Sequence, residues 1–338
     1  MIRVAINGFG RIGRSAFKIA MDNPHIDVVA INDLTDTVTL AYLLKHDSNY
    51  GAYHKDVASY EGGIEVDGQK IQVLAERDPL KLPWDKLKID VVIESTGFFT
   101  KAEDANMHIK SGAKKVVVSA AIKNDENNPL AGNFLIGVND DQLANQSIIS
   151  NQSCTTNCIT PIAYVIEKEF GIEKSLMTTV HAYTASQALQ DAPNKDLREG
   201  RNAAENIVPT TTNATVAATK ILPALKGNFL GLSIRVPVPV VSISDFTIVT
   251  KKDVTVEQVN EAIKTAARSA KMRHILDYTE EELVSSDFIG NPHSAIADLK
   301  LTQVVGGNLV KVVAWYDNEW GYSNRLVEMV ERVGKQAK

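Results

Sequence analysis

Residues 2–33, IRVAINGFGRIGRSAFKIAMDNPHIDVVAIND, decide the fold of the N-terminal part of the chain. An apolar run at residues 2–6 ends in a glycine cluster, and residues 11–21 carry apolar side chains at helical spacing. A second apolar run at residues 28–31 ends at Asn32 and Asp33. Strand, helix and strand thus follow one another within about 30 residues, which predicts a parallel sheet.

The glycine cluster has the spacing G-x-G-x-x-G, with Gly8, Gly10 and Gly13 between the first strand and the helix. These glycines permit a tight turn, close approach of a pyrophosphate and close packing of the helix on the strand. The helix N-terminus favours the negative charge. Asp33 lies 20 residues beyond Gly13, where a carboxylate binds ribose hydroxyls and repels a 2′-phosphate. The segment therefore predicts a dinucleotide site that prefers NAD to NADP.

Length and composition narrow the class of protein. A chain of 338 residues exceeds the usual size of one hydrophobic core, so we expect two domains. The net charge of -5 gives no field that would attract nucleic acid or an anionic membrane. The sequence shows neither a signal peptide nor a run of roughly 20 apolar residues that would cross a bilayer. We expect a cytoplasmic protein without nucleic-acid or membrane partners.

The remaining sequence falls into two textures. Strand-like runs at residues 90–94 and 115–119, with a helical stretch around 102–111 between them, continue the alternation to about residue 150. From Ser175 onward, β-like runs at 176–181, 232–236, 242–250 and 309–315 dominate, with a helix at 256–272. A final helix from about Ser323 places Leu326, Met329, Val330 and Val333 on one face. The fold class is therefore α/β, with a Rossmann-type dinucleotide-binding domain followed by a mixed α+β domain.

The chain has two cysteines, Cys154 and Cys158, four positions apart, which excludes a disulfide framework. Cys154 lies at the start of an expected helix, where the helix N-terminus lowers the pKa of a thiol and makes it a nucleophile. Pro161 either kinks this helix or delays its start. Cys158 is a packing residue in preference to an oxidation-sensing partner. No metal is expected, because two thiols lack the second pair that a structural zinc site needs.

Among seven histidines, His181 ends an apolar β-like run in the segment TTVHAYT. A histidine can pair with a reactive thiol as its base. A histidine at a strand end is also commonly a structural residue, and the sequence alone does not bring His181 to Cys154.

Ten segments, in order from end to end, resemble glyceraldehyde-3-phosphate dehydrogenases. They are NGFGRIGR, INDLTD, STGFF, SNQSCTTNCITP, TTVHAYT, KDLR, NIVPT, ALKG, RVPVPVVS and WYDNEWGYSNR. The resemblance implies phosphorylating oxidation of glyceraldehyde 3-phosphate to 1,3-bisphosphoglycerate with NAD. It also implies that Cys154 is the nucleophile, carrying a thioester, and that His181 is its base.

The resemblance further implies the binding residues, the domains and the assembly. Cofactor-binding residues would be Gly8, Phe9, Gly10, Arg11, Ile12, Gly13, Asp33, Arg77, Thr96, Gly97, Ser119, Asn318 and Tyr322. Substrate and inorganic phosphate would be held by Ser153, Thr155, Thr184, Arg198, Thr212, Asn213 and Arg235. Residues 1–153 and 318–338 would form the NAD-binding domain and 154–317 the catalytic domain, in a homotetramer.

Several positions depart from the family pattern around the anion sites. A carboxylate after HAYT is replaced in Ala185-Ser186-Gln187, Glu199 stands where a cation is common, and Thr212-Asn213 replaces Thr-Gly. Val238 and Val240 replace Thr and Asn. Ala192-Pro193 replaces a Leu-Pro that favours NAD, so some use of NADP is a hypothesis.

Two alternatives stay open at this point. An erythrose-4-phosphate dehydrogenase of the same family would discharge its thioester with water, although the HAYT segment and Tyr316 argue against it. A catalytically silent scaffold of the same fold would lack the reaction altogether. Whether the enzyme serves glycolysis or the reverse direction is not legible in the sequence.

Overall fold

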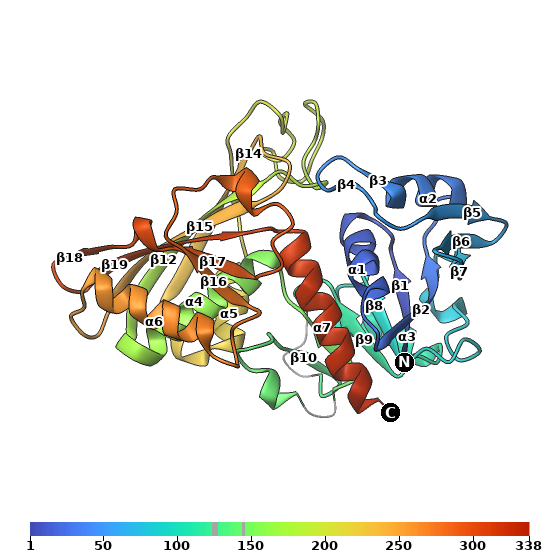
Figure 1. The fold of residues 1–338 in the computed structure, drawn as a ribbon, viewed down its shortest axis with the longest axis horizontal. Coiled ribbons are helices and arrows are strands. Elements are labelled where there is room, and N and C mark those ends of the chain that lie inside the picture. Colours follow the sequence, from blue (N-terminus) through green and yellow to red (C-terminus); the bar gives the residue numbers. More distant parts are fainter. Residues whose placement is uncertain (124–127, 144–145, 338) are drawn as a thin grey trace. The chain divides into compact units, whose positions relative to one another are not determined.

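The computed structural model describes residues 1–123, 128–143 and 146–337. The chain divides into two compact units. The first contains Met1–Ile136, Asp140–Gln152 and Ser323–Lys338, and the second contains Gly137–Asn139 and Ser153–Tyr322. Figure 1 shows the chain coloured along its sequence.

The first unit is built on a nine-stranded sheet with the order β10-β11-β9-β8-β1-β2-β7-β6-β5. The strands from β10 to β7 in this order are parallel, as residues 2–33 predict. Strands β5 and β6 add an antiparallel edge that was not predicted. The bounds are β1 (Ile2–Asn7), β2 (Ile26–Asn32), β5 (Val57–Tyr60), β6 (Gly63–Val66), β7 (Gln69–Leu74), β8 (Val91–Glu94), β9 (Lys115–Val118), β10 (Ala131–Asn133) and β11 (Ile148–Ser150).

The helices of this unit are α1 (Arg11–Met21), α2 (Thr37–Lys45) and α3 (Ala102–Lys110), and a short pair, β3 (His46–Asp47) with β4 (Gly51–Ala52), follows α2. Helix α7 (Trp320–Gln336) runs from the end of the second unit into the first. It begins three residues before Ser323, because the Asp317 carboxylate accepts a hydrogen bond of 2.7 Å from the Trp320 N–H. The predicted apolar face is confirmed, since Leu326, Met329, Val330 and Val333 are buried.

The second unit contains an eight-stranded mixed sheet with the order β13-β14-β12-β15-β19-β17-β16, and β18 pairs with β19. Its strands are β12 (Ile172–Ala182), β13 (Val208–Thr211), β14 (Phe229–Val236), β15 (Ser242–Thr250), β16 (Leu276–Thr279), β17 (Ala295–Asp298), β18 (Gln303–Val305) and β19 (Leu309–Tyr316). Helices α4 (Cys154–Phe170), α5 (Ala214–Ile221) and α6 (Val256–Arg268) share one apolar core with one face of this sheet (Figure 1).

Helix α4 decides where Cys154 lies. The helix begins at Cys154 and includes Pro161, so the alternative in which Pro161 delays its start is wrong. The cause is the N-cap, because the Ser153 hydroxyl accepts a hydrogen bond of 3.1 Å from the Thr156 N–H. Within the described residues, no helix is long and apolar enough to span a membrane.

Candidate active site

The glycine turn of the first unit has the geometry that its spacing predicts. Gly8 has a φ of +91°, and a Cβ there would lie 2.7 Å from the Thr96 nitrogen. A Cβ on Gly13 would overlap the carbonyl oxygen of Gly8. The Asp33 carboxylate accepts hydrogen bonds from the N–H groups of Phe9, at 2.8 Å, and Thr35, at 3.0 Å. The turn is therefore held to the end of β2 by the same acid that was expected to bind ribose.

A cavity of about 600 Å³ opens beside this turn. Five predicted cofactor residues line it: Gly8, Gly10, Asp33, Arg77 and Thr96. Seven further residues that were not predicted also line it: Asn7, Asn32, Leu34, Glu76, Ser95, Phe98 and Phe99. A Cβ on Gly10 would meet no atom within 4 Å, so the backbone is open on this side. The cavity has the glycines, the acid and the helix N-terminus that a dinucleotide needs.

Other predicted cofactor residues of the first unit lie around the cavity lining. The Phe9 ring packs edge-on against Phe17, at 5.4 Å between centroids, while Ile12, Gly13, Gly97 and Ser119 are not in the lining. Arg11 forms an ion pair of 3.1 Å with Asp47, and Arg14 donates a hydrogen bond of 2.8 Å to the Phe9 carbonyl. Arg14 therefore holds the turn from behind.

The second unit brings Cys154 and His181 together. Cys154 begins α4, and His181 lies near the end of β12, with 3.5 Å between Sγ and Nε2. Along β12 the side chains of Met177, Thr179 and His181 are buried beneath the helices, while Leu176 faces outward. The two-residue period of the strand therefore turns His181 toward the N-terminus of α4.

The hydrogen bonds of His181 define its tautomer. Its Nδ1 lies 2.7 Å from the Ala182 carbonyl oxygen, which can only accept, so Nδ1 carries the proton. Nε2 is then the bare nitrogen and faces the thiol. Burial and the Arg235 charge lower the pKa of His181 to about 3, which keeps the ring neutral near pH 7.

The pKa of Cys154 differs from the sequence-based expectation. Burial raises this pKa, and the Arg235 charge and the hydrogen bonds at Thr155 lower it by less. The expected thiolate stabilised by the helix N-terminus is therefore wrong for the resting pair, because desolvation outweighs those effects. The pair rests as a thiol beside a neutral imidazole that can accept its proton.

Arg235 reaches this pair through the sheet. Strands β12 and β14 are parallel, and their register places Arg235 directly opposite His181. Its Nη1 lies 3.5 Å from the Ala182 carbonyl oxygen, and within the described residues its buried Nε has no hydrogen-bond partner. An orphaned guanidinium donor beside a thiol is suited to an anionic ligand.

A buried layer of hydroxyls supports the pair. The Tyr316 hydroxyl lies 3.0 Å from that of Thr155 and 2.8 Å from that of Thr179. The Ser242 hydroxyl donates to Asn318 Oδ1 at 3.0 Å and accepts from the Ala182 N–H at 3.1 Å. Residue-by-residue reading did not predict Thr179 or Ser242, although the alternation along β12 and the RVPVPVVS segment contain them.

The predicted phosphate-binding residues lie at three places in the second unit. Ser153 and Thr155 are at the start of α4, Thr212 and Asn213 precede α5, and Thr184 follows β12. The Thr184 hydroxyl lies 3.0 Å from that of Ser186, and the Thr184 N–H donates to Gln187 Oε1 at 3.3 Å. Arg198 is exposed, and Glu199 accepts a hydrogen bond of 3.1 Å from the Thr210 hydroxyl.

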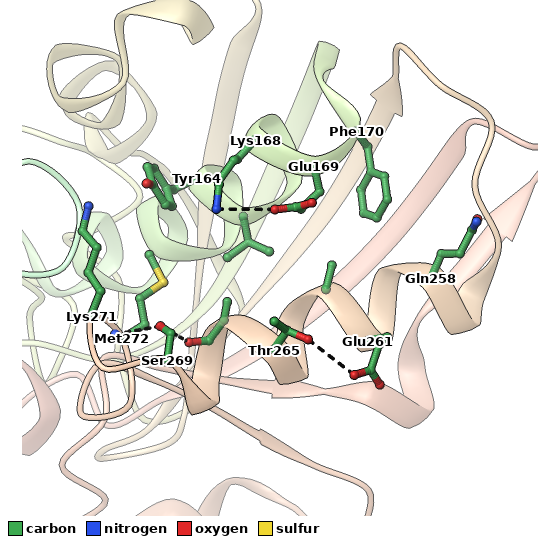
Figure 2. A pocket seen from close by; sticks show the side chains of 13 residues that line it. Tyr164, Lys168, Glu169, Phe170, Gln258, Glu261, Thr265, Ser269, Lys271 and Met272 are labelled. Atoms are coloured by element: carbon green, nitrogen blue, oxygen red, sulfur yellow. Dashed lines mark hydrogen bonds and ion pairs between the residues drawn. The ribbon is translucent and has the colours of Figure 1, made fainter.

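A separate groove of about 530 Å³ lies between α4 and α6 (Figure 2). It is lined by the C-terminal half of α4, so neither Cys154 nor His181 reaches it. Its charges are largely paired, because Lys168 lies 3.6 Å from Glu169 and the Lys271 ammonium lies over the Tyr164 ring. In the part of the chain that the structure describes, no cluster of three or more His, Cys, Asp or Glu is arranged to hold a metal ion.

A Rossmann-type unit with a dinucleotide cavity, and a mixed unit with a paired thiol and imidazole, define the class: an oxidoreductase with a nicotinamide cofactor that acts on an aldehyde. Two family profiles specify it. "Glyceraldehyde 3-phosphate dehydrogenase, NAD binding domain" matches residues 2–102, and "Glyceraldehyde 3-phosphate dehydrogenase, C-terminal domain" matches residues 153–318.

Full-length relatives agree with these profiles. Glyceraldehyde-3-phosphate dehydrogenases of Streptomyces coelicolor and Geobacillus stearothermophilus are 51% and 48% identical to the chain, and glyceraldehyde-3-phosphate dehydrogenase 1 of Bacillus subtilis is 48% identical. Each comparison covers 99% of both sequences. The chain belongs to the glyceraldehyde-3-phosphate dehydrogenase family, and the predicted family and fold class are confirmed.

Proposed function

We propose that this protein oxidises glyceraldehyde 3-phosphate to 1,3-bisphosphoglycerate, reversibly, with NAD and inorganic phosphate. The observation that carries the proposal is the 3.5 Å contact between the Cys154 thiol and the bare Nε2 of His181. The family supplies the reaction, and the contact supplies the nucleophile and its base.

The first step forms a bond between Cys154 and the aldehyde. The thiol proton moves to His181 Nε2 as the sulfur attacks the carbonyl carbon, and the carbonyl electron pair moves to oxygen. Transfer within the pair avoids a free buried thiolate, whose formation burial opposes. The Nδ1 hydrogen bond to Ala182 keeps the ring aimed at the sulfur and stabilises the imidazolium that forms.

The resulting thiohemiacetal oxygen needs a donor. The protonated Nε2 of His181 and the Cys154 N–H at the start of α4 supply hydrogen bonds to that oxygen. When bound, NAD accepts the hydride that leaves the carbon carried by Cys154. The carbon then remains on Cys154 as a thioester.

Inorganic phosphate completes the reaction by attacking the thioester, which releases the acyl phosphate and returns the sulfur to its thiol form. For the attacking phosphate, we propose the ligands Ser153, Thr155, Thr212 and Asn213. For the substrate phosphate, we propose Thr184, Arg198 and Arg235. The unpartnered Nε of Arg235 and the buried, unpartnered Nε2 of Gln187 support an anion here, and a hydroxyl at Ser186 adds no repulsive charge.

The cofactor is NAD, and we propose that Asp33, Arg77, Thr96, Gly97 and Ser119 hold its adenosine half. Asn318 would hold the nicotinamide carboxamide, and Tyr322 would lie nearby. The fixed Oδ1 of Asn318, hydrogen-bonded to Ser242, supports this role because it sets the orientation of the amide. The ratio of kcat/KM for NAD to that for NADP tests this preference: we expect it well above one, and a value near one would support the Ala192-Pro193 hypothesis instead.

We further propose a homotetramer and a cytoplasmic location. Leu176 and Leu230 are register partners on the outer face of the sheet, exposed by 64% and 61%, and Leu232 on the same face is exposed by 45%. Exposed apolar patches of this kind mark interfaces. Two free cysteines, one of them a nucleophile, suit a reducing compartment. The two structural units would be the NAD-binding and catalytic domains.

The test is a steady-state assay in which aldehyde, NAD and phosphate are varied independently. We expect NADH formation that requires glyceraldehyde 3-phosphate and saturates with phosphate. NADH formation that is indifferent to phosphate, or faster with erythrose 4-phosphate, would favour the erythrose-4-phosphate dehydrogenase alternative. Absence of NADH formation with every aldehyde would favour a silent scaffold.

A further inference from the structure

Three neighbouring parallel strands of the first unit end in a buried polar residue. Strand β1 ends at Asn7, β2 at Asn32 and β8 at Glu94. Asn7 is the register partner of both Asn32 and Glu94, so the three side chains form a row across the sheet. The row lies at the carboxyl ends of the strands, the edge at which open α/β sheets bind ligands.

Glu94 lies at the end of this row as a buried carboxylate, exposed by only 2%. Its Oε2 accepts from Asn7 Nδ2 at 2.6 Å and lies 3.0 Å from His108 Nε2. Its Oε1 accepts from the N–H of Thr96 at 2.8 Å and from the Thr96 hydroxyl at 2.5 Å. The described residues give it no lysine or arginine partner. Four hydrogen bonds therefore compensate its burial in place of a counter-charge.

His108 is fixed in one tautomer. The indole N–H of Trp84 can only donate, and it lies 3.0 Å from His108 Nδ1, so Nδ1 must accept. The proton of the neutral ring is then on Nε2 and is donated to Glu94. His108 is completely buried and lies behind Glu94, so it supplies a donor that cannot turn away.

The other end of the row is anchored by the backbone. The Glu76 N–H donates to Asn32 Oδ1 at 2.9 Å, which fixes the orientation of that amide. Asn32 Nδ2 then donates to Asn7 Oδ1 at 2.7 Å, and Asn7 Nδ2 is left to donate to Glu94. One directed chain of hydrogen bonds therefore joins the segment at Glu76 to the turn at Thr96. Both segments line the dinucleotide cavity.

We propose that Glu94, held by His108, is a positioning residue for the adenosine half of the cofactor. Its carboxylate receives both the N–H and the hydroxyl of Thr96, and the Thr96 hydroxyl in turn accepts from the Phe98 N–H at 3.1 Å. The charge of Glu94 thus fixes the turn at residues 95–99 before the ligand arrives, and binding need not order it. The inference rests on the proposed use of NAD and adds the residues that shape its pocket from beneath.

Glu94→Gln tests the charge with little change of shape. A glutamine has one acceptor oxygen where the carboxylate has two, so either Thr96 or the Asn7 and His108 donors lose their acceptor. The matched control is Asp90→Asn, at the other end of β8. Asp90 is also a buried carboxylate, and it accepts a hydrogen bond of 2.9 Å from the Arg3 N–H and lies 2.8 Å from Lys114 Nζ.

The dissociation constant of NAD is measured by calorimetry on the full-length variants, together with Tm and the KM values of NAD and aldehyde. For Glu94→Gln we expect a dissociation constant and a KM for NAD raised about tenfold, with the KM of the aldehyde unchanged. Asp90→Asn is expected to lower Tm and leave NAD binding as in the wild type. If Glu94→Gln does not fold, Glu94→Asp keeps the charge but shortens its reach, and it is expected to weaken NAD binding in the same selective way.

Wild-type affinity for NAD in Glu94→Gln would overturn the inference, and so would equal weakening by Glu94→Gln and Asp90→Asn, which would indicate general loosening of the unit. A wild-type protein that binds NAD but forms no NADH would overturn the proposed reaction alone. A wild-type protein that does not bind NAD would overturn both.

Discussion

The two units each bury a histidine, and the two histidines are wired in opposite ways. His181 donates from Nδ1 to a backbone carbonyl and leaves Nε2 bare beside a thiol. His108 accepts at Nδ1 from Trp84 and donates from Nε2 to Glu94, so both of its nitrogens are committed. A buried histidine with one open nitrogen can move a proton, whereas one with two fixed partners can only hold its neighbours in place.

The largest expected effect follows from removing the thiol. Cys154→Ser should lower kcat by more than about a thousandfold, because a serine hydroxyl is a far weaker nucleophile and forms no thioester. Steady-state NADH formation measures this loss. Cys158→Ala is the matched control, since Cys158 is buried in the same helix and should retain most of kcat. Equal losses in the two variants would mean that the helix, and not the nucleophile, was damaged.

The two histidines can be compared directly by the same substitution. His181→Asn should lower kcat by about a hundredfold to ten-thousandfold, the range of a lost general acid–base group. His108→Asn should leave kcat within about tenfold and act mainly on the KM of NAD and on Tm, because it touches no reacting atom. A kcat loss in His108→Asn as large as that in His181→Asn would contradict the distinction.

The charge of Arg235 gives the comparison a pH dependence. Burial raises the pKa of Cys154, so the rate of its alkylation by iodoacetamide should increase with pH above neutrality. Arg235 opposes that rise, and replacing it in Arg235→Gln should move the profile to higher pH and slow alkylation at pH 7 by about tenfold. His181, with a pKa of about 3, should add no step near pH 6.5.

The control for this shift is Arg198→Gln, an exposed arginine for which no effect on the alkylation profile is expected. A wild-type rate that is already constant from pH 6 upward would show an ionised thiol in the resting enzyme. It would contradict the neutral pair.

The smallest effect on activity is expected from Trp84→Phe. The change removes the only donor in contact with His108 Nδ1 and leaves a buried acceptor unsatisfied, which costs about 1–3 kcal/mol of unfolding free energy. Denaturant unfolding measures the loss. The kcat should stay near the wild-type value, since Trp84 acts only through His108 and Glu94. A large fall in kcat at unchanged stability would assign this cluster a chemical role.

Local sequence patterns predicted what local physics decides. The glycine turn, α1 at Arg11–Met21 and β15 at Ser242–Thr250 lie where the spacing placed them. The region from α2 to β7 was missed, because its strands are short and mostly solvent-facing, so they carry little apolar periodicity. The antiparallel edge of the first sheet was missed for the same reason.

Long-range pairing was outside the reach of the sequence patterns. Nothing in the spacing of Cys154 and His181 shows that β12 passes beneath the start of α4, or that β14 brings Arg235 opposite His181. The expected low thiol pKa considered the helix N-terminus but could not include desolvation. The row of Asn7, Asn32 and Glu94 is visible in the sequence as a polar end to each apolar run, but only the register shows that the three residues touch.

The most direct measurement of the thiol mechanism is the mass of the enzyme after rapid mixing with glyceraldehyde 3-phosphate and NAD in the absence of phosphate, followed by acid quenching. We predict an acyl adduct on the peptide that contains Cys154, absent in Cys154→Ser and discharged when phosphate is added. Turnover without such an adduct, or an adduct on another residue, would contradict covalent catalysis by Cys154.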